Sequence, residues 1–440
     1  MTDAEILSTD PYWWSTSPVS DFPTQSLPED LDLLVIGAGY TGLSAALTAF
    51  KLGAKVAVVD ATKSGFGAST RNGGMVGAHP RVGWNTLASK FGDAAANKIF
   101  SEASDALDFF KTLIFDESID CDFQECGRIQ LAWTPIDHEQ QKSLASIIKS
   151  KSDVKVEIVN KANLESEIFT NRYFGGLLFP EHGSINPAKF HKGLLDSVRE
   201  RKIVVLENSP VKSVVREKNT HKVFFDKAVV SVRKVLLATN GYTINQFSWF
   251  KKRVFPVPSF LIATEDIDPE LLTKLAPGRR MMVETRAKYS YFRISPNGRK
   301  ILFGGRAAMK PIDLDLAAKR LKTLLDDIWP EIKSYKISNV WTGNTGYSFN
   351  HLPHVGKHNE IYYAMGFSGS GTVLAPYLGA KAAFQAFDDA RGVTGYSETS
   401  LKTRFFHFSS KPYFLGAANF YYQYFVDPKQ RRAGEKKAAR

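Results

Sequence analysis

Cysteine is scarce in this sequence, with two in 440 residues. Two thiols cannot form a disulfide framework for a chain of this length, and they cannot supply the four thiolates of an iron–sulfur cluster. Cys121 and Cys126 lack the C-x-x-C spacing of a redox or zinc motif, and no second pair lies nearby. We therefore predict two reduced thiols in a cytoplasmic protein, and no metal site.

Acidic residues are also in short supply, with 45 Asp and Glu against 57 Lys and Arg, a net charge of +12. Residues 429–440 hold six basic residues and one acidic residue, so this short segment carries five units of the excess. A terminal charge run beside Ala and Gly is typical of a solvated tail. The remaining charge is spread thinly, and the chain has no helix-turn-helix, zinc-finger or RNA-binding signature, so we expect no nucleic-acid partner.

A secretory signal is missing as well, because the first residues include Asp3 and Glu5 and lack a basic start followed by an apolar core. We expect the protein to stay in the cytoplasm. Two uncharged stretches, residues 33–50 and 361–380, approach the roughly 18–20 residues of a membrane span. Glycines interrupt both, so we interpret each as a buried strand, a glycine turn and a buried helix.

The first of these stretches belongs to a dinucleotide-binding pattern. An apolar strand over residues 31–36 leads into Gly37, Gly39 and Gly42 and then into a helix. The glycines allow a tight turn, a close approach of the backbone to a pyrophosphate, and packing of the helix on the strand. A second strand ends at Asp60, whose carboxylate can accept hydrogen bonds from a ribose. An acid here disfavours NADP and leaves FAD and NAD as candidates.

Two further glycine-rich segments favour FAD over NAD. Residues 65–77 form a turn with Ser69, Arg71 and Asn72, which supply hydrogen-bond donors and a cation for a diphosphate or a flavin edge. Residues 362–374 repeat the order of strand, glycine turn and helix. The N-terminus of that helix can lie against the flavin N1/C2=O locus and stabilise reduced flavin, an element for which an NAD enzyme has no use.

The sequence resembles the flavoproteins related to D-amino-acid oxidase and sarcosine oxidase. Residues 71–74 are similar to their R-x-G-G signature, residues 175–187 to the segment before the helix that leads to the adenine-binding strand, and residues 366–371 to their C-terminal flavin loop. The most similar branch is that of gamma-glutamylputrescine oxidoreductase, which shares an N-terminal extension of the type found at residues 10–14.

The length of 440 residues suggests two or three folding units, at roughly 100–200 residues each. The resemblance implies an α/β plus antiparallel β fold, with a Rossmann-like FAD-binding domain and an interleaved substrate domain. The expected boundaries are an N-terminal extension (1–30), an FAD-binding domain (31–80, 151–242 and 339–400), a substrate domain (81–150 and 243–338), a C-terminal segment (401–428) and a basic tail (429–440).

The resemblance also implies the chemistry. It predicts oxidation of a carbon–nitrogen bond in an amine or amino-acid-like substrate, such as a gamma-glutamylputrescine-like amine, by hydride transfer to flavin N5 followed by imine hydrolysis. The electron acceptor is O2 or another oxidant. The alternatives are an NAD-dependent dehydrogenase and a non-catalytic FAD-binding protein.

Departures from the relatives refine this expectation. Sarcosine-type oxidases attach FAD to a cysteine shortly before the C-terminal loop, whereas residues 341–350 contain none, and dimethylglycine-type relatives use a histidine where this chain has Arg71. We therefore expect non-covalent FAD. Val373 and Leu302 stand where sarcosine oxidases carry lysines for the substrate carboxylate and for oxygen activation. These differences argue against a simple N-methyl amino acid as substrate.

The resemblance assigns site residues by position, and no residue is assigned a catalytic role. The residues expected to bind FAD are Gly37, Gly39, Thr41, Gly42, Asp60, Ala61, Ala68, Ser69, Arg71, Asn72, Gly73, Gly74, Val211, Ala238, Thr239, Gly369, Ser370, Gly371 and Thr372. Because arginine suits a bidentate grip on a carboxylate, the candidates for the substrate wall are Tyr291, Arg293, Arg306, Tyr347 and His351. The aromatic run 414–425 is expected to pack against the FAD-binding domain rather than to dock on a membrane.

Overall fold

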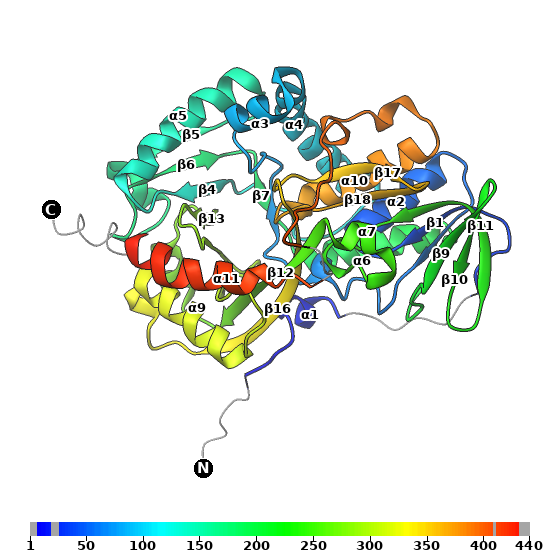
Figure 1. The fold of residues 1–440 in the computed structure, drawn as a ribbon. Helices are drawn as coiled ribbons and strands as arrows, with labels where there is room; N and C mark the ends of the chain where they lie inside the picture. The colour runs from blue at the N-terminus through cyan, green and yellow to red at the C-terminus, as the bar shows by residue number, and fades with distance from the viewer. Residues whose placement is uncertain (1–6, 19–25, 408–410, 431–440) are drawn as a thin grey trace, which may run out of the picture.

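The computed structural model describes residues 7–18, 26–407 and 411–430, and its two large sheets stand at opposite sides of the molecule (Figure 1). Helices cover the faces of both sheets. The main helices are α1 Tyr12–Thr16, α2 Tyr40–Lys51, α3 Trp84–Phe91, α4 Asp93–Asp116, α5 Pro135–Lys151, α6 Pro187–Glu200, α7 Ser248–Lys251, α8 Pro269–Leu275, α9 Leu314–Ile328, α10 Gly371–Ala386 and α11 Phe414–Tyr421.

The first sheet contains the strands that the glycine motifs predicted. Its strands are β1 Leu31–Ile36, β2 Val56–Val59, β8 Val204–Leu206, β9 Ser213–Glu217, β10 Thr220–Phe224, β11 Val229–Leu237, β17 His354–His358 and β18 Ile361–Met365. They run in the order β17-β18-β11-β1-β2-β8, and the β9–β10 hairpin extends from β11. β1 pairs in parallel with both β2 and β11.

Strand β1 buries both of its faces, which explains its continuous apolar run. Leu33 and Val35 join the core on the side of α2 and α10, whereas Leu34 and Ile36 join the core on the opposite face. Alternate side chains of a strand point to opposite faces, so a strand covered on both sides needs no polar positions. The two uncharged stretches are therefore confirmed as strand, turn and helix: β1 with α2, and β18 with α10.

The second sheet is mainly antiparallel and forms the other wall of the molecule. Its order is β16-β12-β15-β14-β13-β4-β6-β5, and α9 packs its apolar stripe into the core on one face. The strands are β4 Arg128–Leu131, β5 Glu157–Asn160, β6 Gly175–Phe179, β12 Val254–Thr264, β13 Met281–Glu284, β14 Ser290–Ile294, β15 Ile301–Gly305 and β16 Ile337–Ser348, and a small separate sheet pairs β3 Met75–Val76 with β7 Gly183–Ser184.

The boundaries predicted from the sequence need correction in three places. β5 and β6 were expected in the FAD-binding domain, within residues 151–242, but both belong to the second sheet. β16 crosses the boundary predicted at residue 339 and also lies in the second sheet. α4, expected in the substrate domain, contributes Ile99 and Phe100 to the core of the first sheet. An apolar run shows that a segment is buried, but it does not show which sheet the segment joins.

Helix α11 covers the second sheet, which corrects the expectation that the C-terminal segment packs against the FAD-binding domain. Leu415 joins an apolar cluster with Phe255 and Tyr347, and the Asn419 Oδ1 accepts a hydrogen bond from the Met309 N–H at 3.0 Å. Figure 1 shows α11 in red on this side of the molecule. Most of the predicted basic tail, from residue 431 on, lies outside the described residues. Among the helices that are described, none combines the length and the apolar character needed to cross a bilayer.

Two phenylalanines of α4 test the assignment of one side of this helix to the buried core. Phe110 is 0% exposed and Phe115 is 83% exposed. Phe110→Ala leaves a cavity and should lower the free energy of unfolding by about 3–5 kcal/mol, whereas Phe115→Ala should change it by less than about 0.5 kcal/mol. Urea denaturation followed by circular dichroism measures both, and equal losses would contradict the assignment.

Candidate active site

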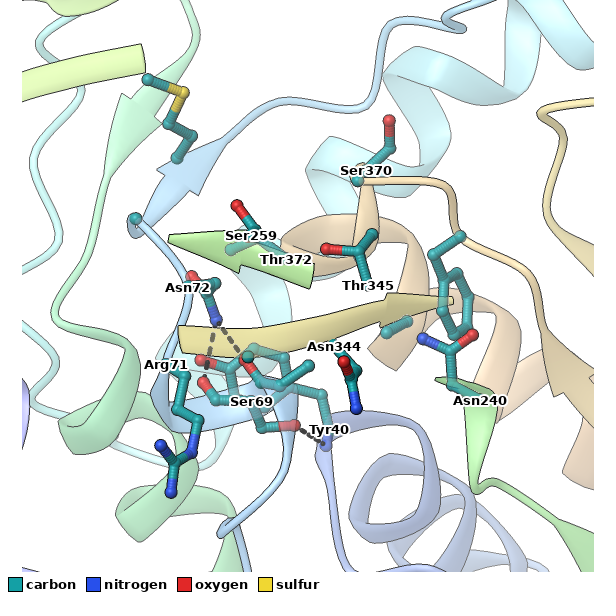
Figure 2. Close-up of a pocket in the computed structure, with 18 of the residues that line it drawn as sticks. Tyr40, Ser69, Arg71, Asn72, Asn240, Ser259, Asn344, Thr345, Ser370 and Thr372 are labelled. Atoms are coloured by element: carbon teal, nitrogen blue, oxygen red, sulfur yellow. Dashed lines mark hydrogen bonds between the residues drawn. The ribbon is translucent and has the colours of Figure 1, made fainter. Parts of the chain in front are cut away.

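A cavity of about 940 Å³ lies between the carboxyl ends of the parallel strands and the second sheet. Loops within residues 37–41, 60–73, 238–244 and 367–372 form one side, and residues of β4, β12, β13, β14 and β16 form the other. Figure 2 shows part of this cavity, with side chains from several distant segments turned toward one another. The carboxyl ends of parallel strands are the usual place for a ligand in an α/β fold.

The turn between β1 and α2 depends on glycine at two positions. Gly37 has a φ of +112°, and a Cβ there would lie 2.9 Å from the Ala238 carbonyl oxygen. A Cβ on Gly42 would lie 1.8 Å from the Gly37 carbonyl oxygen, so no side chain fits at that position. α2 therefore begins directly against the end of β1, with Gly39 as its N-cap. The helix N-terminus that results is suited to a pyrophosphate.

Asp60 follows β2 and shapes the edge of the cavity. Its Oδ2 accepts the Ala38 N–H at 2.8 Å, and its Oδ1 accepts the Thr62 N–H at 2.9 Å. Burial raises the pKa of the Asp60 carboxyl, and these two N–H groups oppose that shift. Asp60 lines the cavity together with Ala61 and Val211. A carboxylate at the end of the second strand suits a ribose hydroxyl.

Asn72 organises the second glycine loop and links it to α2. Its Nδ2 donates to the carbonyl oxygens of Ala68 (3.2 Å) and Ser69 (2.9 Å), and its Oδ1 accepts the Gly74 N–H at 2.8 Å. The Ser69 Oγ accepts the Tyr40 N–H at 3.1 Å, as Figure 2 shows. These hydrogen bonds hold the loop across the N-terminus of α2.

Arg71 borders the cavity, but its head group holds the loop. Its Nε donates to the Phe66 carbonyl at 2.8 Å and its Nη1 to the Thr342 carbonyl at 3.2 Å. The guanidinium lies over the rings of Trp14 and Phe66, at 4.6 and 4.5 Å from the ring centroids. Figure 2 shows it pointing away from Ser370 across the cavity. The cation that the sequence offered to a diphosphate is therefore engaged by the protein itself.

Three indole N–H groups hold the same loop from outside, a contribution that the sequence interpretation missed. They donate to three successive residues: Trp14 to the Thr70 hydroxyl (2.9 Å), Trp341 to the Arg71 carbonyl (2.9 Å) and Trp13 to the Asn72 carbonyl (2.8 Å). Two of these indoles come from the N-terminal extension. Its paired tryptophans are the sequence signal for this role, since a buried indole requires a hydrogen-bond acceptor.

The C-terminal glycine loop closes the opposite end of the cavity. Gly366 and Gly369 have φ values of +79° and +97°, where other residues are strained. The loop leads into α10 with Ser370 as N-cap, and no side chain caps this end. The first turn of α10 lines the cavity through Gly371 and Thr372. An uncapped helix N-terminus is suited to negative charge at this end of the cavity.

Seventeen of the nineteen residues predicted to bind FAD line this cavity. Gly42 and Gly74 do not, because both serve backbone packing. Gly42 allows the helix contact described above, and a Cβ on Gly74 would lie 2.2 Å from the Ile185 carbonyl oxygen.

The residues predicted for the substrate wall lie at different depths. Tyr291 lines the cavity, and its hydroxyl is 2.9 Å from the Ser259 Oγ. Arg306, Tyr347 and His351 do not line the cavity. Arg306 donates to the Tyr347 hydroxyl, and the ring of His351, an exposed residue, meets the Tyr347 ring edge-on. Desolvation of the ring, together with nearby arginine charges, lowers the pKa of His351.

Arg293 is turned into the protein, which corrects its predicted place in the substrate wall. It is buried, and it donates to the carbonyl oxygens of Ile185 (2.8 Å) and Ile294 (3.1 Å) and to the Ser184 Oγ (3.1 Å). Three protein oxygens thus take up its donors. Arg293 supports the small β3–β7 sheet beneath the second glycine loop.

The sequence interpretation missed Arg81 and Tyr289, which meet beside the C-terminal glycine loop. The Arg81 Nη1 donates to the Ser368 carbonyl at 2.6 Å and to the hydroxyls of Tyr289 (3.0 Å) and Tyr347 (3.3 Å). Burial alone raises the pKa of Tyr289, but the charges of Arg81 and Arg306 outweigh it and lower this pKa to about 7. Both Arg81 and Tyr289 line the cavity.

Arg128 is a second missed cation of the cavity wall. It comes from β4, and its guanidinium lies 4.7 Å from the centroid of the Phe179 ring. Its Nε is buried without a hydrogen-bond partner, and burial followed by the charge of Arg81 lowers its pKa to about 10. The alternation of polar and apolar residues in β4 could have indicated this position. Ile129 and Leu131 enter the core, while Arg128 and Gln130 line the cavity.

Comparison with known proteins decides the family. The family described as DAO, FAD dependent oxidoreductase, matches residues 32–385 of this chain. The chain belongs to this family. The DAO family match covers both sheets and every loop around the cavity, and it ends within α10, before α11. The predicted fold class and cofactor are thereby confirmed, and the NAD-dependent alternative receives no support.

Relatives of known description agree with the DAO family. The chain is 28% identical over 377 residues to a probable oxidoreductase, OrdL, of Haemophilus influenzae, covering 84% of this chain and 85% of the relative. It is 27% identical over 377 residues to the gamma-glutamylputrescine oxidoreductase of Escherichia coli, covering 84% and 86%. In fold it resembles the glycine oxidase of Geobacillus kaustophilus, with a TM-score of 0.70, 17% identity and coverage of 84% and 99%.

The cavity fits the FAD of the DAO family on its own geometry. Two helix N-termini face it, its glycine turn leaves no room for a side chain at Gly42, and a carboxylate stands at the end of β2. Cys121 and Cys126 are free thiols that do not line the cavity. Neither is therefore placed to attach to a flavin in it.

We expect acid to release the cofactor intact. Precipitation of the purified holoprotein with trichloroacetic acid should leave the yellow flavin in the supernatant and a colourless pellet, because no thiol lies at the cavity. Absorbance of the two fractions measures the outcome. Colour that stays with the pellet after washing would show a covalent bond and contradict this expectation.

Proposed function

We propose that this protein oxidises a carbon–nitrogen bond in an amine that carries a carboxylate at a distance from the nitrogen. The pair Arg81 and Arg128 carries this proposal. Both guanidinium groups line the cavity, and within the described part of the chain neither forms an ion pair with a carboxylate. Arg81 is already hydrogen-bonded to protein oxygens, whereas Arg128 has only a ring face and a donor without a partner.

Arg81 is exposed to the open cavity and Arg128 is partly buried, and the two like charges repel each other unless an anion joins them. A substrate that fills the cavity would withdraw both guanidinium groups from water, which costs several kcal/mol for an ion that stays unpaired. A substrate carboxylate offers two acceptor oxygens that match the planar donors of arginine. Such an anion would satisfy the free Arg128 donors and offset the repulsion between Arg128 and Arg81.

The polar lining of the cavity supports a substrate that contains an amide. Besides Arg128, the cavity is lined by the polar side chains of Gln130, Gln140, Gln141 and Thr285. Amide side chains donate and accept hydrogen bonds, as an amide-containing substrate requires. The gamma-glutamyl amine suggested by the Escherichia coli relative has this character. We therefore infer a gamma-glutamyl amine, or an amine of similar length and charge, as the substrate.

The residues of the cavity wall have different roles in the proposed reaction. FAD, held by the loops around Gly37, Ser69 and Ser370, would supply the two-electron acceptor chemistry of the family. Arg81 and Arg128 bind the carboxylate, and their position determines how far from the carboxylate the amine nitrogen must lie. Tyr289, as phenolate, accepts a proton from the substrate ammonium, because only a neutral amine can be oxidised at the adjacent carbon. The imine then leaves for hydrolysis, and O2 or another oxidant takes the electrons.

The cysteines support the cytoplasmic location that we propose. Cys121 is buried, Cys126 is partly buried, and both are free thiols. Free thiols are typical of a reducing compartment.

An anaerobic substrate panel tests the proposed function. The holoenzyme is mixed without oxygen with amines of graded length, each with and without a terminal carboxylate, and the flavin absorbance is followed. We expect bleaching by the carboxylate-bearing amines, with a gamma-glutamyl amine among the fastest. If no amine bleaches the flavin, amine oxidation is excluded; repetition in air shows whether O2 accepts the electrons.

Arg128→Met tests the carboxylate site with little change in side-chain volume. Loss of a charged hydrogen bond of about 1.5–3 kcal/mol should raise KM for the carboxylate-bearing amine roughly 10- to 100-fold. KM for the matching amine without a carboxylate should stay unchanged. Arg299→Met, on an exposed turn of the same sheet, is the control variant. Equal effects on both amines would indicate a structural role for Arg128 instead.

Tyr289 predicts a pH dependence. Its pKa is lowered to about 7, so the phenolate fraction increases as pH rises through 7, and the limiting rate of anaerobic flavin reduction should rise and then level off. Tyr289→Phe should remove this step and lower the rate by about 10²- to 10⁴-fold. Tyr291→Phe should keep the step, because burial raises the pKa of Tyr291. A step near pH 7 that persists in Tyr289→Phe would refute the role.

A further inference from the structure

The C-terminal segment has an unusual composition that the oxidation chemistry does not use. Ten of the 21 residues from 405 to 425 are Phe or Tyr. The segment also lies beyond residue 385, where the match to the DAO family ends. The family match therefore does not account for its aromatic content, which requires a separate explanation.

Helix α11 and its continuation have one face packed and one face open. The packed face includes Leu415, which is 6% exposed and joins the cluster of Phe255 and Tyr347 on the second sheet. The open face is aromatic, and its side chains are more than half exposed: Tyr413 (70%), Phe420 (58%), Tyr421 (57%), Tyr424 (58%) and Phe425 (51%), with Phe405 (92%) in the preceding loop. We call these six residues the aromatic face.

Four residues of the aromatic face, Phe420, Tyr421, Tyr424 and Phe425, form one contiguous group of rings. The rings of Phe420 and Tyr424 have centroids 4.7 Å apart, and those of Tyr421 and Phe425 are 5.8 Å apart. Large contiguous apolar patches on a protein surface usually mark a site of interaction. The patch is convex, because it lies along the outside of a helix, and neither the cavity described above nor the pocket lined by residues 149–157 includes any of its members.

Polar contacts between the inner side of α11 and the rest of the protein keep the aromatic face turned toward solvent. The Asn419 Oδ1 accepts the Met309 N–H at 3.0 Å. Asp427 forms an ion pair with Lys288 at 2.8 Å. At the end of the helix, the Gln430 carbonyl accepts the Trp133 indole N–H at 3.0 Å. These contacts prevent the helix from rotating to bury its aromatic side.

The C-terminal sequence that contains this surface is rich in positive charge. Residues 399–440 contain nine basic and two acidic residues, which is seven of the twelve units of net charge. One of the two acids, Asp427, is already paired with Lys288. Lys402 and Arg404 lie just before Phe405 and are exposed, and Lys429 begins the basic tail.

We propose that the aromatic face and the basic residues of the same C-terminal sequence dock this enzyme on an anionic lipid surface. Exposed aromatic side chains insert at the level of lipid headgroups, and flanking Lys and Arg are attracted to anionic lipids. A convex helix suits a bilayer, which needs no complementary pocket. A second copy of the chain would bring the same positive charge to the contact and would be repelled. This proposal goes beyond amine oxidation and does not depend on it.

Vesicle co-sedimentation of the full-length holoenzyme tests the proposal. The probes are phosphatidylcholine vesicles and vesicles in which roughly a third of the lipid is phosphatidylglycerol. We expect at least about tenfold more protein on the anionic vesicles, because several basic residues each strengthen binding, and we expect high salt to release it. Flavin absorbance and turnover monitor the fold and the active site separately.

A pair of variants assigns the binding to this surface. Phe420→Ser with Phe425→Ser should abolish sedimentation with anionic vesicles and leave flavin content and turnover unchanged. Phe115→Ser removes an exposed aromatic side chain from α4 and should bind like the unaltered protein. Equal sedimentation with both lipids, no sedimentation, or full binding by the double variant would overturn the proposal. Self-association that the double variant abolishes would overturn it too, and would assign the surface to a second copy.

Discussion

The backbone contact between Gly37 and Gly42 is the constraint on which the cavity depends. It brings the start of α2 against the end of β1, so the helix N-terminus faces the space beyond the sheet. α10 is held against α2 in the same way, since a Cβ on Gly379 would lie 2.3 Å from the Thr41 carbonyl oxygen. The backbone contact between α2 and α10 thus places the positive N-termini of both helices at one cavity. The distance between these two N-termini is fixed by the backbone and does not depend on side chains.

The opposite wall of the cavity is organised for binding rather than for stability. Arg81 and Arg128 line the open cavity without a carboxylate partner among the described residues, and Tyr289 lies between the charges of Arg81 and Arg306. Like charges held close together repel each other in the empty protein. The arrangement becomes favourable when an anion enters, which is why we relate these side chains to the substrate. The second sheet supplies the rigid strands that hold them.

Local motifs predicted the first half of the site and not the second. Gly37, Asp60 and Ser370 follow strands at fixed spacings, so their positions in the cavity could be derived from neighbours in the sequence. Arg81 and Arg128 are far apart in the sequence and carry no motif. They come together because Arg81 donates to Tyr289 beside β14, and β14 belongs to the same sheet as β4. Arg293 shows the converse error: an arginine in a strand beside the site was expected to bind substrate, but protein oxygens take up its donors.

The sequence by itself determined the cofactor-binding half of this protein, because a glycine turn between a strand and a helix is a local structure whose geometry its own residues specify. It also showed the aromatic and basic character of the C-terminal segment. Tertiary structure alone decided which strands share a sheet, which arginines face the cavity, and which side of α11 is exposed. These depend on contacts between residues that are remote in the chain, and an apolar or alternating pattern indicates burial without naming the partner.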